Sequence, residues 1–189
     1  MTSQEEALAS LARLLEQHQI DYMVIGGLAN AVWGEPRATL DIDVTIAAET
    51  SDTLRVVTAL ESEFRVLTSD PASFVRETRV LPLESRSGVR VDLIFGLLPF
   101  EREAVARARP VEVAGGVVRF CTPEDLILLK IISRREQDLA DVQGILRRRL
   151  RELDLDYLEP RIEELSTLLS RPEIWQNWSE WKTESEESP

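Results

Sequence analysis

The chain contains 189 residues, of which 34 are Asp or Glu and 22 are Lys or Arg, so its formal net charge is -12 at pH 7. A typical domain has about 100 to 200 residues, so we expect one core domain and a smaller appendage. One cysteine and one histidine exclude an internal disulfide and a zinc site of the Cys/His kind. The negative charge disfavours a dedicated nucleic-acid-binding module, because it repels phosphate backbones.

The sequence shows no sign of membrane insertion. It has no run of about 18 uncharged apolar residues, the length that a membrane span needs. Residues 1–10 lack the basic start and the apolar stretch of a signal peptide. We therefore expect a soluble, cytoplasmic protein with no membrane partner.

Helix, strand and helix are predicted in succession near the N-terminus. Leucines recur at helical spacing within Glu5–Gln19, which predicts an amphipathic helix. A short buried strand, Tyr22–Ile25, runs directly into Gly26 and Gly27. Leu28–Trp33 then has helical character.

The segment Leu40–Ile46 alternates apolar and polar residues, which predicts a strand. Leu40 begins its apolar face, whereas Asp41, Asp43 and Thr45 share the opposite, open face.

The middle of the chain is predicted to combine helices and hairpins. Ser51 can cap a helix that runs to about Phe64 and buries Leu54, Val57 and Leu60 or Ala59. The other expected elements are a hairpin over 74–83 and 89–95, a helix over 100–107 and a small edge hairpin over 111–113 and 117–120.

Only helices are predicted after Thr122, which is placed as an N-cap before Pro123. We expect them over residues 123–133, 137–149, 155–169 and 172–181. The predicted organisation is an α+β core over 1–121, a helical region over 122–181 and a disordered acidic tail over 182–189.

Three aspartates indicate a metal site. Asp41 and Asp43 leave the same face of the predicted strand, about 6.6 Å apart along the backbone, so both carboxylates can reach one ion. Asp92, on another strand, supplies a third oxygen ligand if the two strands are neighbours. Carboxylates without His or Cys favour Mg²⁺ or Mn²⁺.

The glycines before the second helix indicate a phosphate site. Gly26 and Gly27 expose backbone N–H groups at the end of a strand and allow an anion to approach closely. Arg37 lies four residues before Asp41 and is placed to approach a nucleotide phosphate. Taken alone, Gly-Gly is usually a turn and Asp-x-Asp is common on exposed strand faces. The hypothesis of a functional site therefore depends on the order and spacing of the two motifs.

The pattern IGGLANAVWGEPRATLDIDVTI followed by VRVDLIFG resembles the nucleotidyltransferase fold of the DNA polymerase beta superfamily. Within it, Arg37, Thr39, Asp41 and Asp43 resemble the Arg-x-Thr-x-Asp-x-Asp of AbiEii-type toxin nucleotidyltransferases from abortive-infection toxin–antitoxin systems. The stretch TPEDLILLKIISRREQDLADV is similar to their helical Lys, Arg and Asp-x-x-Asp segment. The residues at the matching positions are Lys130, Arg134 or Arg135, Asp138 and Asp141.

The resemblance implies a mixed sheet flanked by helices that transfers a nucleotidyl group from a nucleoside triphosphate, such as ATP, to an acceptor hydroxyl. It implies that the metal-binding catalytic residues are Asp41, Asp43 and Asp92. It further implies that the nucleotide is bound by Gly26, Gly27, Arg37, Thr39, Lys130, Asp138 and Asp141. The acceptor is RNA, including tRNA, a protein or a small molecule, and an antitoxin is an expected partner.

Several alternatives stay open. The fold is also compatible with a catalytically inactive nucleotide-binding or interaction module, or with a plain structural domain whose aspartates do not converge. Lys130, Asp138 and Asp141 have an alternative reading as a solvated, ion-paired helix face. The basic run Arg147–Arg151 reads as a solvated helix face or as a binding patch. Three tryptophans, Trp175, Trp178 and Trp181, are core anchors or, alternatively, a homodimer contact.

Overall fold

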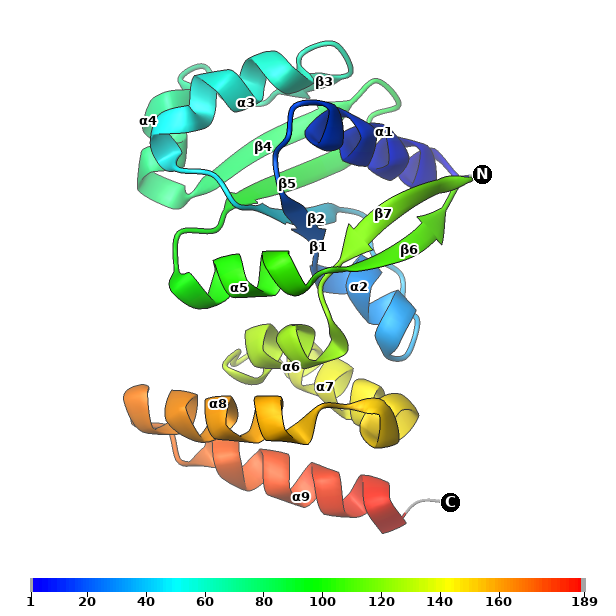
Figure 1. The fold of residues 1–189 in the computed structure, drawn as a ribbon, viewed down its shortest axis with the longest axis vertical. Coiled ribbons are helices and arrows are strands. Elements are labelled where there is room, and N and C mark those ends of the chain that lie inside the picture. Colours follow the sequence, from blue (N-terminus) through cyan, green and yellow to red (C-terminus); the bar gives the residue numbers. More distant parts are fainter. Residues whose placement is uncertain (1, 188–189) are drawn as a thin grey trace. The chain divides into compact units, whose positions relative to one another are not determined.

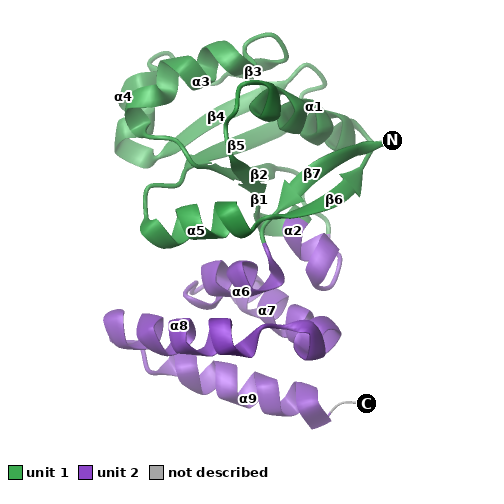
Figure 2. Ribbon diagram, in the orientation of Figure 1, with its two compact units in different colours: residues 1–28, 38–121 green, residues 29–37, 122–189 purple. Residues whose placement is uncertain are grey.

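The computed structural model describes residues 2–187 (Figure 1). These residues divide into two compact units, which Figure 2 distinguishes by colour. Unit 1 contains the residues up to 28 together with 38–121, and unit 2 contains 29–37 together with the residues from 122 onward. The helix α2 (Gly26–Trp33) begins in unit 1 and continues in unit 2.

Unit 1 is built on a 7-stranded sheet in the order β3-β4-β5-β2-β1-β7-β6. The strands are β1 (Tyr22–Val24), β2 (Ile42–Ile46), β3 (Phe64–Val66), β4 (Val80–Ser85), β5 (Arg90–Phe95), β6 (Arg109–Val113) and β7 (Gly116–Phe120). The pairs β2–β5 and β1–β7 are parallel, and the other neighbours are antiparallel. The sheet is therefore mixed, and β2 lies near its centre.

Helices flank this sheet within unit 1. They are α1 (Ser3–Gln17), α3 (Thr53–Leu60), α4 (Pro71–Thr78) and α5 (Pro99–Arg107), and a 3-10 turn η1 (Thr50–Asp52) precedes α3. Helix α1 contacts β7 and α3, and α5 contacts β1 and β2 (Figure 1). The apolar side chains of the central strands, among them Val44 and Leu93, are completely buried by this packing. The predicted α+β class is thus confirmed.

Unit 2 is helical apart from its loops. It contains α6 (Pro123–Ile131), α7 (Glu136–Arg149), the 3-10 turn η2 (Leu150–Glu152), α8 (Leu155–Leu168) and α9 (Glu173–Glu187). Helix α6 packs on α7 and α8, and α9 packs on α7 and α8. Thr122 caps α6 as predicted, because its hydroxyl accepts a hydrogen bond from the N–H of Asp125. Of the three tryptophans, Trp178 is completely buried and Trp175 and Trp181 are half-buried.

The helix predicted over residues 51–64 is too long. Helix α3 ends at Leu60, and Phe64 begins the edge strand β3, where it pairs with Ser85 of β4. The buried side of α3 carries Val56 rather than Leu54, whose exposed fraction is 64%. Pairing with a distant strand overrides the local helical pattern here.

The first strand of the predicted hairpin begins too early. Residues 74–78 belong to helix α4, which starts at Pro71 after the N-cap Asp70. The side chain of Asp70 accepts a hydrogen bond from the N–H of Ser73, and proline is favoured at the first helical position. The helix ends at Arg79, which adopts a left-handed conformation with φ of 63°.

Two further predictions need correction. Leu40 is 85% exposed rather than part of an apolar strand face, because the ladder between β2 and β5 begins only at Ile42. Residues 182–187, expected to be a disordered tail, continue helix α9. Lys182 helps to hold them, since its Nζ lies 2.7 Å from Oε1 of Glu159 on α8. The remainder of the predicted tail, residues 188–189, lies outside the described residues.

Among residues 2–187, none of the helices has both the length and the apolar character that crossing a bilayer requires.

Candidate functional site

Two of the predicted aspartates lie side by side on the central strands of unit 1. Asp43 of β2 and Asp92 of β5 are directly paired in the parallel ladder. Neighbouring strands are about 4.8 Å apart, and paired residues project from the same face, so the two carboxylates share one face of the sheet. The strands that carry them are neighbours, which is the condition on which the third-ligand hypothesis depended.

The third aspartate, Asp41, lies immediately before β2 and affects the pKa of Asp92. Partial desolvation of its carboxyl group raises the pKa of Asp92 above its ordinary value of 3.8, the negative charge of Asp41 raises it further, and Arg90 partly opposes both effects. Asp41 is therefore close enough to repel the charge on Asp92. A cation between such carboxylates relieves this repulsion.

Gly26 lies directly against Asp43. Its φ is +65°, and a Cβ atom added to it would stand 2.1 Å from Oδ2 of Asp43. Residues with a side chain rarely adopt this conformation, and no side chain fits in the remaining space. Glycine is thus required here both by the turn and by the close approach of a carboxylate.

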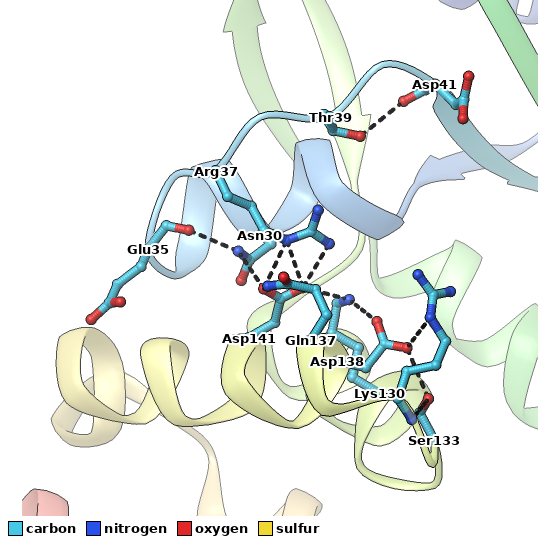
Figure 3. Close-up of polar contacts among 11 residues, drawn as sticks. Asn30, Glu35, Arg37, Thr39, Asp41, Lys130, Ser133, Gln137, Asp138 and Asp141 are labelled. Atoms are coloured by element: carbon cyan, nitrogen blue, oxygen red, sulfur yellow. Dashed lines mark hydrogen bonds and ion pairs between the residues drawn. The ribbon is translucent and has the colours of Figure 1, made fainter.

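Gly27 stands in a similar relation to Thr39. A Cβ atom on Gly27 would lie 2.7 Å from both Cβ and Oγ1 of Thr39. The hydroxyl of Thr39 is 3.4 Å from the backbone oxygen of Asp41, as the dashed line in Figure 3 shows. Four of the predicted site residues, Gly26, Gly27, Thr39 and Asp41, are thus brought to the segment around Asp43.

The helix that begins at Gly26 provides donors for an anion. The first N–H groups of a helix have no partner within it and carry a partial positive charge. In α2 the first two of these groups belong to Gly26 and Gly27, which carry no side chain of their own to hold a phosphate at a distance. Donors for phosphate oxygens and carboxylates for a cation therefore lie together in unit 1.

The chemistry of these donors fits magnesium. Among residues 2–187, no group of three or more His, Cys, Asp or Glu side chains gathers closely enough to hold a metal ion by itself. Mg²⁺ does not need such a group, because it usually takes one or two protein carboxylates and completes its coordination with water and substrate phosphates. Asp43 and Asp92 provide two such carboxylates.

The predicted residues of unit 2 form a second cluster, drawn in Figure 3. Nζ of Lys130 lies 2.7 Å from Oδ1 of Asp138 and 2.8 Å from Oδ2 of Asp141. Arg37 also binds Asp141, with Nε 3.0 Å from Oδ1 and Nη2 2.9 Å from Oδ2. Nε of Arg135 lies 3.6 Å from Oδ2 of Asp138, so three cations contact the two carboxylates.

This ion-pair cluster is buried. The side chains of Lys130 and Asp141 are only 7% and 3% exposed. Burial alone raises the pKa of Asp141, but hydrogen bonds from Arg37 and Lys130 outweigh it and hold the pKa below its ordinary value. The same balance holds for Asp138, whose pKa is lowered mainly by the hydrogen bonds from Lys130 and Ser133. Lys130 and Asp141 are therefore ion-paired, as the alternative interpretation expected, but they are buried rather than on a solvated helix face.

Among the members of this cluster that sequence reasoning missed, Asn30 of α2 is completely buried. Its Nδ2 donates to the backbone oxygen of Glu35 at 2.8 Å and to Oδ1 of Asp141 at 3.1 Å. Its signal in the sequence is an amide within the otherwise apolar Leu28–Trp33, because a buried polar side chain requires partners. Gln137 is a weaker addition, with Nε2 3.3 Å from Oδ1 of Asp141.

Comparison with known proteins agrees with this architecture. A family model described as "Nucleotidyltransferase of unknown function (DUF6036)" matches residues 5–187. No curated protein matches the sequence.

Three solved structures illustrate the likeness. The antibiotic-resistance factor ANT(2'')-Ia has a TM-score of 0.58 and 14% identity, over 90% of this chain and 95% of that one. An antigenic nucleotidyltransferase-like protein from Paracoccidioides brasiliensis has a TM-score of 0.56 and 18% identity, over 94% of this chain and 93% of that one. A putative nucleotidyltransferase from H. pylori has a TM-score of 0.52 and 14% identity, over 98% of this chain and 95% of that one. At these identities the likeness concerns the fold.

Proposed function

Since the chain belongs to the nucleotidyltransferase family DUF6036, we propose that it transfers a nucleotidyl group from a nucleoside triphosphate to an acceptor hydroxyl with Mg²⁺ as cofactor. The observation that carries this proposal is the direct pairing of Asp43 with Asp92 beside the glycine turn that opens α2. Carboxylates for a cation and N–H groups for phosphate are the two elements that transfer from a triphosphate requires.

The residues of unit 1 divide the chemistry between them. The N–H groups of Gly26 and Gly27 bind phosphate oxygens, and Thr39 lies against this turn. Asp43 and Asp92 would hold Mg²⁺, and Asp41 adds a third negative charge near Asp92. When bound, the ion neutralises charge on the phosphates and on the attacking oxygen. The acceptor oxygen forms a bond to the α-phosphorus while the bond to pyrophosphate breaks, and the hydroxyl proton passes to the carboxylate of Asp92.

In unit 2, the proposed nucleotide-binding residues are Arg37, Lys130, Asp138 and Asp141. Lys130 neutralises triphosphate charge, and the two carboxylates fix its ammonium group by ion pairs of 2.7 and 2.8 Å. Arg37 fixes Asp141 in turn through two parallel hydrogen bonds. Burial of this cluster supports a positioning role, because a held cation needs no reordering when the nucleotide binds.

The biological role in the proposal is that of a toxin controlled by an antitoxin. It is supported by the AbiEii-like spacing of Arg37, Thr39, Asp41 and Asp43. The acceptor is RNA, including tRNA, or a protein. A small-molecule acceptor is the alternative, because one structure of similar fold, ANT(2")-Ia at a TM-score of 0.50 and 15% identity, was solved with adenylyl-2"-tobramycin.

The test is a transfer assay with each α-labelled nucleoside triphosphate, Mg²⁺ and, in separate reactions, total RNA, tRNA, cell protein or an aminoglycoside. The variant Asp43→Asn removes the paired carboxylate at nearly constant size. The control variant Asp21→Asn makes the same change at an exposed residue before β1. We expect transfer by the wild type and by Asp21→Asn but not by Asp43→Asn. Nucleotide binding without transfer to any acceptor would instead support an inactive nucleotide-binding module.

A further inference from the structure

The basic run at the end of α7 lines a cavity within unit 2. The cavity measures about 590 Å³ and is bounded by the end of α7, the turn η2, the start of α8 and the end of α9. Its arginines are Arg147, Arg148, Arg149 and Arg151. A volume of several hundred Å³ is within the range of ligand sites. We call it the arginine pocket.

The arginines of the pocket retain N–H donors that a ligand could accept from. Arg147 pairs with Glu35 at 2.9 Å and Arg149 with Glu152 at 2.8 Å, while Arg148 donates to the backbone oxygen of Gly34 at 2.6 Å. A guanidinium group has five N–H donors, so these contacts leave donors unused.

Arg151 differs from its neighbours. Its guanidinium group makes no hydrogen bond or ion pair with any of residues 2–187, and the side chain is exposed. Glu152 and Glu186 line the pocket and Glu184 lines a smaller hollow that shares Arg147 with it, so four arginines less three glutamates leave a local charge of +1. In a chain whose net charge is -12, this pocket is a local exception.

The pocket combines charge with apolar and aromatic surface. Its lining includes Leu153, which is 9% exposed, and Leu155, which is half-buried. A smaller hollow of about 100 Å³ shares Arg147 with it and is lined by Trp181, which is half-buried. Basic side chains beside an accessible aromatic ring are typical of sites where phosphates are neutralised and a base stacks.

Arginines at a helix C-terminus also favour the helix dipole, and exposed ion pairs form easily. That reading accounts for the last turn of α7, where Arg147, Arg148 and Arg149 lie. It does not account for Arg151, which follows the helix without a partner, or for the neighbouring Trp181.

We propose that the arginine pocket binds the phosphate backbone of single-stranded RNA, with a base stacked on Trp181. The four arginines follow one another along the end of α7 and the turn η2. A row of cations suits successive phosphates better than it suits a single small anion. The identification of this RNA as the acceptor rests on the proposed function, but RNA binding itself does not.

The test measures binding of a labelled single-stranded RNA by fluorescence anisotropy across a series of salt concentrations. The variant Arg147→Gln/Arg151→Gln removes two cations from the pocket. The control Arg55→Gln/Arg76→Gln removes two exposed cations from α3 and α4 in unit 1. We expect the pocket variant to bind at least about tenfold more weakly, with a salt slope reduced by about 1.4, twice the value for one phosphate contact of a single strand. The control should bind like the wild type.

A charge change of opposite sign sharpens the test. Glu186→Gln removes a carboxylate from the pocket lining and should strengthen RNA binding, which a purely structural role of the arginines does not predict. Trp181→Leu should weaken binding without changing the salt slope, because stacking involves no phosphate charge.

Three results would overturn the inference: no RNA binding by the wild type, equal weakening in both arginine variants, or equal binding of duplex DNA with the same dependence on the arginines. Failure of the proposed function is recognised separately, through the variant Asp43→Asn. It should bind RNA as the wild type does, whether or not the wild type transfers a nucleotide.

Discussion

Asp43 and Asp92 occupy directly paired positions on the neighbouring parallel strands β2 and β5. The chain contains nearly fifty residues between them, and the ladder alone brings their carboxylates to the same face of the sheet. Asp41 adds a third negative charge whose effect on Asp92 is visible in the raised pKa. Such a concentration of like charge disfavours folding in the absence of a cation, and its retention is typical of functional sites.

Asp92→Asn should stabilise the metal-free protein at neutral pH while abolishing transfer. Because the pKa of Asp92 is raised in the fold, its ionisation destabilises the folded state once pH exceeds the ordinary value of 3.8. The side chain is exposed, so we expect a rise in Tm below about 4 °C, the shift that about 1 kcal/mol produces at this chain length.

Thermal unfolding with a chelator present measures this effect. The difference between wild type and Asp92→Asn should vanish as pH falls below 3.8, where both side chains are neutral. A variant that is less stable than the wild type at neutral pH would show that Asp92 is a structural residue.

Gly26→Ala should eliminate transfer and destabilise the fold more than a matched substitution elsewhere. Both Gly26 and Gly115 have positive φ, +65° and +77°, so an alanine at either costs about 1 to 2 kcal/mol of backbone strain. Only at Gly26 does the new methyl group also clash, at 2.1 Å from Oδ2 of Asp43, whereas nothing lies within 4 Å at Gly115. Urea unfolding of Gly26→Ala and Gly115→Ala separates strain from clash, and equal losses of stability would contradict the close approach to Asp43.

Lys130→Met should destabilise the protein by about 3 kcal/mol, because it leaves the buried carboxylate of Asp141 and the partly buried one of Asp138 without their shared cation. Arg37 remains on Asp141 and keeps the loss at the lower end of the range for breaking a buried pair. The control Lys182→Met breaks a more exposed pair with Glu159 and should cost about 1 kcal/mol or less.

Denaturant titration of both lysine variants gives these values. The double variant Lys130→Met/Asp138→Asn should recover part of the loss, because it removes one of the two carboxylates that lost the lysine. A loss for Lys130→Met no larger than that for Lys182→Met would mean that the buried cluster does not stabilise the fold.

As pH falls, the free energy of unfolding should decrease more steeply in the wild type than in the variant Asp141→Asn. The pKa of Asp141 is lowered in the folded state, so its stabilisation is complete above the ordinary value of 3.8 and is lost as pH falls through the folded-state pKa. The free energy of unfolding, measured in urea over a series of acidic pH values, should therefore have the smaller pH slope in the variant. Identical slopes would show that Asp141 does not keep its low pKa in solution.

Much of unit 1 was predictable because its signals are local. The strand before Gly26, the alternation that contains Asp43 and the apolar flanks of Asp92 are readable in short windows. The strand β3 was not predicted, because it depends on pairing with the distant residue Ser85. Helix α4 was not predicted either, because its residues are typical of strands and the capping interaction of Asp70 was overlooked.

The contacts of unit 2 were harder to predict. Asn30 and Arg37 meet Asp141 across separations of 111 and 104 residues, so no periodicity reveals that residues 29–37 group with the C-terminal helices. The resemblance identified Lys130, Asp138 and Asp141 as a set but not their burial, which results from packing between α6 and α7. An amide within an apolar helix was the available sign for Asn30.

The most direct test of the central claim compares α-labelled with γ-labelled nucleoside triphosphate in the presence of Mg²⁺ and the acceptor preparations. The account predicts that label from the α-position becomes covalently attached to an acceptor, that label from the γ-position appears in pyrophosphate, and that Asp43→Asn does neither. Attachment of the γ-label, or unchanged transfer by Asp43→Asn, would contradict nucleotidyl transfer at the paired carboxylates.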